Sequence, residues 1–165
     1  MLLLSAGAAG AQQPVPAEPV LIDGPDSAIP LPAGLGTSVA RDGTGGIVYL
    51  KQVAGTPHVF LATLGSGGFG APLEVDGGLA AGASQPVIAA GNDGLLLVAF
   101  VSGGELYVVG RPDGETPFGP PAPLAGGGTN PSISISNFGK AYLAFTVPDG
   151  SGEDVRAAYY HNGSW

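Results

Sequence analysis

An internal repeat constrains the fold of this chain more than any other feature. Residues 84–100 read SQPVIAAGNDGLLLVAF, and residues 129–145 read TNPSISISNFGKAYLAF. At an offset of 45 residues the two segments align Pro86 with Pro131, Gly94 with Gly139 and Phe100 with Phe145. A weaker copy, SVARDGTGGIVYL, occupies residues 38–50. Three units of related sequence therefore follow one another along the chain.

A second landmark recurs late in each unit. It reads Phe69-Gly-Ala-Pro72, then Phe118-Gly-Pro-Pro121, then Gly163-Ser-Trp165. Periods of about 40–50 residues with several short strands each are typical of β-propeller blades. The sequence therefore predicts an all-β fold, an open β-propeller arc of about three four-stranded antiparallel blades. The expected blades span 37–83, 84–128 and 129–165, and the last is incomplete.

The strands of a blade are clearest in the second unit, where turn residues separate short apolar runs. Gly, Asn and Asp tolerate the positive φ angles that tight hairpins require, so they mark the strand ends. The expected strands of the second unit are Val87–Ala90, Leu95–Val101, Glu105–Gly110 and Phe118–Leu124. Those of the first unit are Ser38–Arg41, Ile47–Val53, His58–Leu64 and Ala71–Asp76. Those of the third unit are Ser132–Ser136, Lys140–Val147 and Val155–His161.

Side-chain size differs between the strands in a way that a propeller explains. The first strand of a unit carries small residues, which fit a crowded position near the propeller axis: Ala89, Ala90, Ser134 and Ser136. The second strand carries aromatic residues, which we expect to pack between blades rather than to form a ligand platform: Tyr49, Phe100, Tyr142 and Phe145.

Composition excludes several classes of partner. The 30 Gly and 16 Pro cluster between the apolar runs, as turn residues do, so a disordered linker is not favoured. The net charge is −8, and no basic patch exists that would neutralise phosphates, so we expect no nucleic-acid partner. No apolar run reaches the roughly 18–20 residues of a membrane span. The chain has no Cys, which excludes disulfides and thiolate chemistry.

Residues 1–12 resemble a truncated signal peptide. A short apolar run is followed by small residues at Ala9 and Ala11, an A-x-A-like cleavage pattern before Gln12, and no basic residue precedes the run. The sequence therefore predicts an exported protein, either secreted or held at the cell surface.

A Pro-rich extended lead-in with one strand is expected at 13–36. Within it, EPVLIDG at 18–24 resembles APLEVDG at 71–77, the last strand of a blade. We therefore expect an orphan strand at Val20–Asp23. Three blades would have to bend too sharply for this strand to reach 155–160, so it should stay unpaired or pair near the first blade.

The order of residues within a unit also points to a family. The pattern is Asn/Asp-x-Gly-x-x-Tyr/Leu-Leu/Val-Ala-Phe, an apolar strand, and then Gly-Ser/Gly-Trp/Phe-x-x-Pro. Over residues 37–165 it resembles the blades of exported bacterial β-propellers of the sialidase-like superfamily. Sialidases also carry Asp-box turns, Ser-x-Asp-x-Gly-x-x-Trp. The corresponding turns here, Asn92-Asp-Gly94 and Asn137-Phe-Gly139, lack the Ser and the Trp.

The resemblance does not extend to catalytic residues. A sialidase-like site would require a cluster of arginines, a Tyr–Glu nucleophile pair and an acid/base Asp. Arg41 falls on a first strand, Arg111 ends a third strand, and Arg156 lies inside another third strand. We therefore expect no converging arginines, no catalytic residue and no cofactor.

No metal site is predicted. His58 and His161 lie at the start and the end of third strands in different blades, without an acidic partner at a fixed spacing, so we expect exposed strand-end histidines. Most carboxylates lie in turns, where they bond to their own backbone: Asp42, Asp76, Asp93, Asp113, Asp149 and Asp154. The segment Asp149–Asp154, with Glu153, is the one candidate for Ca²⁺, which prefers several oxygen ligands at a regular spacing.

These observations favour a non-catalytic exported propeller module, a fragment of a longer protein that serves as a binding or scaffolding surface for an unknown glycan or protein ligand. Two alternatives stay open. One is part of a sialidase-like glycan-processing enzyme whose catalytic residues lie outside this chain. The other is a small oligomeric lectin, which would need an aromatic platform in each blade, whereas the one Trp is Trp165.

Overall fold

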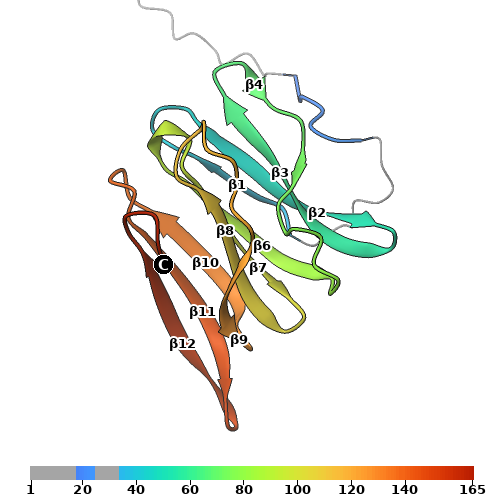
Figure 1. Ribbon diagram of the computed structural model, residues 1–165, viewed down its shortest axis with the longest axis vertical. Coiled ribbons are helices and arrows are strands. Elements are labelled where there is room, and N and C mark those ends of the chain that lie inside the picture. Colours follow the sequence, from blue (N-terminus) through green and yellow to red (C-terminus); the bar gives the residue numbers. More distant parts are fainter. Residues whose placement is uncertain (1–17, 25–33) are drawn as a thin grey trace, which may run out of the picture.

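The computed structural model describes residues 18–24 and 34–165, which form three antiparallel sheets in succession along the chain (Figure 1). The described residues contain twelve strands and one short 3-10 turn but no α-helix. None of them belongs to a helix that is long and apolar enough to cross a membrane. The prediction of an all-β chain with three strand-rich units is confirmed.

Each sheet is a meander in which successive strands are hydrogen-bonded neighbours, except that the last strand of the first sheet pairs with the third strand rather than with the fourth. The first sheet contains β1 (Gly36–Val39), β2 (Gly45–Val53), β3 (Thr56–Gly65), β4 (Gly68–Phe69) and β5 (Leu73–Glu74), and both β4 and β5 pair with β3. The second sheet contains β6 (Ala83–Ala90), β7 (Leu96–Ser102), β8 (Glu105–Arg111) and β9 (Ala122–Gly126). The third sheet contains β10 (Thr129–Ile135), β11 (Ala141–Asp149) and β12 (Gly152–Tyr160).

The fourth strands differ most from the expected ones, and proline explains the difference. Of the strand expected at 71–76, only β5 forms, and a separate short strand, β4, precedes the expected range. The strand expected at 118–124 begins only at Ala122, after Pro120 and Pro121. Proline has no N–H to donate to a ladder, so Pro72 and the pair Pro120–Pro121 stay outside the ladder, although Pro123 is accommodated within β9 opposite Tyr107.

The second and third sheets share a backbone irregularity at the same repeat position. Gln85 and Asn130 have φ angles of 53° and 51°, and the strand register shifts at both. A proline follows each residue, so the missing proline N–H coincides with the break in the ladder. The two bulges are joined, because the Asn130 N–H donates to Gln85 Oε1 at 2.7 Å.

The sheets stack mainly through their first strands. β6 lies against β1, β2 and β3, and β10 lies against β6, β7 and β8. Polar contacts join the same strands: the Ala90 N–H donates to Ser38 Oγ at 3.0 Å, and the Asp93 N–H donates to Asp42 Oδ2 at 2.6 Å. The second sheet is therefore packed between the other two.

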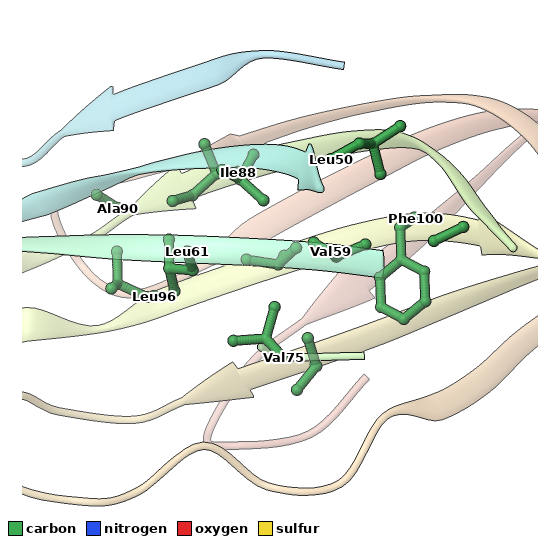
Figure 2. Close-up of a cluster of buried hydrophobic side chains, with 12 residues drawn as sticks. Leu50, Val59, Leu61, Val75, Ile88, Ala90, Leu96 and Phe100 are labelled. Carbon is green, nitrogen blue, oxygen red and sulfur yellow. The ribbon is translucent and has the colours of Figure 1, made fainter. Parts of the chain in front are cut away.

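Two layers of apolar side chains fill the spaces between the sheets. Figure 2 shows the layer between the first and second sheets, which includes Leu50, Val59, Leu61, Val75, Ile88, Ala90, Leu96 and Phe100. The layer between the second and third sheets includes Ala99, Val101, Leu106, Val108, Leu143 and Phe145. Every residue of β7 is buried, as its unbroken apolar run predicts. The predicted packing of Phe100 and Phe145 between sheets is confirmed, whereas Tyr49 is buried on the other side of the first sheet, against Phe60 and Asp23.

Residues 18–24 of the lead-in lie against the first sheet without forming a strand. These residues have no ladder pairing, in agreement with the expectation that this segment stays unpaired, but they form no strand, so the strand predicted at Val20–Asp23 is wrong. Asp23 instead accepts hydrogen bonds from the Tyr49 hydroxyl and from Lys51 Nζ, the latter at 3.0 Å. Side-chain bonds thus hold this segment beside β2. The expected signal segment at 1–12 lies outside the described residues.

Candidate functional site

The three arginines belong to three different sheets. Arg41 lies in the turn between β1 and β2 rather than on a strand, which corrects its predicted place. Arg111 ends β8, where its Nε donates to the Gly94 carbonyl at 3.0 Å and its partial burial lowers the guanidinium pKa. Arg156 lies in β12 and pairs with Asp154 at 3.2 Å. A sialidase-like clamp would require these side chains to converge on one carboxylate.

His58 is buried, and the expectation of an exposed strand-end histidine was wrong for it. Its Nδ1 lies 3.1 Å from Asp76 Oδ2 and 3.9 Å from Glu74 Oε1. These carboxylates lie close because β5 pairs with β3 in a register that sets Glu74 opposite Phe60. Sequence spacing did not reveal this cluster, because it depends on the strand pairing. The other histidine, His161, is exposed as predicted.

Asp76 has no exposed surface, and its carboxylate is held by several donors. Oδ2 accepts the Val59 N–H at 3.0 Å, and Oδ1 accepts the Gly78 N–H at 3.2 Å. The bond to Gly78 is the predicted bond within its own turn. The bonds to β3 compensate for removing the carboxylate from water, which would otherwise be costly.

His58, Glu74 and Asp76 are a candidate cation site. Each offers one ligand atom, and these atoms lie within 4.8 Å of one another. In the part of the chain that the structure describes, no other group of three or more such side chains could hold one ion. The Asp149–Asp154 segment therefore forms no such cluster.

The outer face of the third sheet is a second candidate site. We give this name to the side of the sheet that points away from the second sheet. Its centre is formed by Ser132, Ser134, Tyr142, Ala144, Val155, Ala157 and Tyr159, and Thr146 and Glu153 lie on the same side towards the turn between β11 and β12. Tyr142 is 61% exposed and Val155 is 80% exposed. The core position predicted for Tyr142 is wrong, because successive side chains of a strand point to opposite faces, and Leu143 and Phe145 take the covered side.

Aromatic rings gather at one end of this outer face. The Tyr142 and Tyr159 rings lie 4.8 Å apart between centroids, and the His161 ring stacks on Tyr159 at 5.8 Å. They border an open hollow lined by Ser134, Ile135, Ser136, Phe138, Lys140, Tyr142 and Tyr159. This hollow therefore combines flat apolar rings with hydroxyls and one amine.

The second sheet has the same face, but there it is covered. The residues that correspond in strand register to the seven central residues of that outer face are Val87, Ala89, Leu97, Ala99, Leu106, Val108 and Gly110. They are apolar, and those of β7 and β8 other than Gly110 pack against side chains of the third sheet. The same strand positions are thus an interface in one sheet and an exposed surface in the next.

The chain matches no protein-family model, and a comparison with curated proteins finds no significant relative. A function for this chain must therefore be inferred from the geometry of its described residues.

Proposed function

We propose that this chain is an open arc of a β-propeller, a non-catalytic exported module that binds or scaffolds through the outer face of its third sheet. The occupant of that face is a further antiparallel sheet of the same kind. The proposal is supported by three successive meanders that stack through their first strands, which is how blades are arranged in a propeller.

The proposal depends mainly on one observation: the same strand positions are covered in the second sheet and exposed in the third sheet. The second sheet buries this face against the third sheet, and the third sheet leaves the equivalent positions in solvent. A contact that joins one surface of a unit to a different surface of the next unit can be repeated until a ring closes or a filament grows. A further sheet is the partner that we favour, because the equivalent face of the second sheet is already covered by a sheet, the third one.

The chemistry of the face agrees with docking. The seven central side chains carry no charge, and Glu153 lies on the same side towards the turn between β11 and β12. The centres of protein interfaces are depleted of charged residues and enriched in tyrosine. An exposed surface with an uncharged and partly aromatic centre marks an interaction site.

Self-association of the purified chain tests the proposal, because a second copy is itself such a sheet protein. Sedimentation velocity should show concentration-dependent association, and Val155→Lys should weaken it by about tenfold or more, since the lysine must be desolvated on docking. Leu73→Lys is the control, because Leu73 is a half-exposed apolar residue of β5 that shares with its register partner, Leu61, the side of the first sheet facing the second sheet. A wild-type chain that stays monomeric, or equal behaviour of the two variants, would overturn the proposal.

Glycan binding is the second candidate, favoured by the hollow beside Tyr142 and Tyr159. Aromatic rings present an apolar face on which a sugar ring stacks, and Ser134, Ser136 and Lys140 offer hydrogen-bonding groups beside them. NMR titration with a panel of monosaccharides distinguishes the two candidates. Shifts at these residues that Tyr159→Ala abolishes would support glycan binding, and their absence from the whole panel would refute it.

A further inference from the structure

We infer that His58, Glu74 and Asp76 form a binding site for one divalent transition-metal ion, with Zn²⁺ as the best match. The inference is independent of the docking face, which lies on a different sheet. It depends on the positions of the three side chains, on the way each is held, and on the chemistry of their ligand atoms.

The distances between the ligand atoms suit a first coordination shell. Bonds of about 2.0–2.2 Å from Zn²⁺ to imidazole nitrogen and carboxylate oxygen place neighbouring ligands of a tetrahedral site about 3.3 Å apart. His58 Nδ1 lies 3.1 Å from Asp76 Oδ2 and 3.9 Å from Glu74 Oε1. Small side-chain rotations would therefore bring all three atoms to bonding distance of one ion.

Backbone hydrogen bonds and strand pairing position the carboxylates of Asp76 and Glu74 before any metal binds. Asp76 is fixed by the N–H groups of Val59 and Gly78, each of which uses one lone pair of a carboxylate oxygen and leaves another for a metal. Carboxylates that ligate metals are commonly hydrogen-bonded in this way. Glu74 is held by the pairing of β5 with β3, and its side chain is 34% exposed, which leaves a route of entry.

The second sheet indicates that this cluster is not required to build such a meander. Its strand order is that of the first sheet, yet the residue of β8 nearest in register to His58 is Glu105, which is exposed and lies opposite Gly126 on β9. No imidazole meets a carboxylate there. A buried histidine between two carboxylates is therefore specific to the first sheet, and the same strand order forms without it.

The set of ligands selects the type of ion. One imidazole nitrogen and two carboxylate oxygens suit Zn²⁺, whereas Ca²⁺ takes six to eight oxygen ligands. The two carboxylate charges balance a divalent ion. Three protein ligands leave a fourth position of a tetrahedral ion open to water.

Calorimetric titration of the full chain, freed of metal with a chelator, tests the inference. We expect one Zn²⁺ per chain and no Ca²⁺ binding at the same site. Glu74→Gln should weaken the zinc affinity by about tenfold or more, and because Glu74 is partly exposed, this variant should fold normally. Glu105→Gln, an exposed glutamate in the second sheet, is the matched control and should bind as the wild type does.

Cobalt substitution provides a readout that a purely structural role would not change. Co²⁺ bound to nitrogen and oxygen ligands should give visible absorption bands that disappear in Glu74→Gln and persist in Glu105→Gln and His161→Ala. The inference would be overturned by an absence of zinc binding, by equal affinities of the wild type and Glu74→Gln, or by loss of binding in His161→Ala, which would assign the ion to the exposed histidine.

Discussion

The outward surfaces of the first and third sheets differ although the two sheets share a strand order. On the first sheet, Tyr49 is only 6% exposed, its hydroxyl donates to Asp23, and Lys51 lies over the Phe60 ring. On the third sheet, Tyr142 and Val155 are largely exposed. The alternation of side chains along a strand decides which face of the sheet a side chain lies on. Whether that side chain is buried depends on the segment that packs against the face.

We expect the largest changes in the free energy of unfolding from truncating side chains that are buried between two sheets. Phe100→Ala and Phe145→Ala should each lower the free energy of unfolding by about 3–5 kcal/mol, the usual cost of truncating a buried Phe. Urea denaturation measures both values. Changes below about 0.5 kcal/mol would mean that these rings are not core residues.

Tyrosine truncation compares the two outward surfaces directly. Tyr49→Ala should cost about 3 kcal/mol, because it removes a buried ring and the hydroxyl that donates to Asp23. Tyr142→Ala should cost less than about 0.5 kcal/mol, as expected for an exposed side chain. Thermal and urea unfolding of the two variants, measured side by side at low protein concentration, would show the difference. Equal losses would contradict the contrast between the surfaces.

An intermediate effect, between those of the two tyrosine variants, concerns the Asp23 carboxylate that joins residues 18–24 to β2. Asp23→Asn should cost about 1–2 kcal/mol near neutral pH, because it weakens hydrogen bonds to Tyr49 and Lys51. The Tyr49 hydroxyl, followed by Lys51, lowers the pKa of Asp23 below 3.8. The stabilisation is thus complete above the unfolded-state pKa and is lost as the pH falls through the lower folded-state pKa.

Unfolding of wild type and Asp23→Asn at several pH values checks this dependence. The difference in unfolding free energy should be constant above about pH 5 and should shrink below about pH 4. A difference that stays the same down to about pH 2 would mean that the Asp23 charge contributes nothing to the contact.

The repeat made most of the strand order predictable, because turn residues and short apolar runs act locally. Gly91, Asn92 and Asp93 were expected to turn the chain, and Asp93 does so with a φ of 60°. The continuous apolar run of β7 likewise predicted a strand covered on both faces. Strand ends near Pro72 and Pro121 were harder to predict, because a proline affects pairing over several neighbouring residues.

The candidate sites could not be read from the sequence, because each depends on contacts between distant segments. His58 meets Asp76 only after β5 has paired with β3, and no local pattern indicates that register. Tyr142 follows the aromatic pattern of a core strand, but it occupies the alternate face. An alternation count along β11, with Phe145 fixed as a core residue, would have placed Tyr142 on the opposite side.

The order of packing has a consequence for how the molecule comes apart. The interfaces join the first sheet to the second and the second to the third, as in a linear array whose stability is a sum over units and the contacts between neighbours. The third sheet shares one apolar layer with the rest, whereas the second shares two. We therefore expect the third sheet to unfold partially while the rest of the molecule stays folded. Amide protons of β11 and β12 should exchange through this partial unfolding, whereas those of β7 should exchange only through global unfolding.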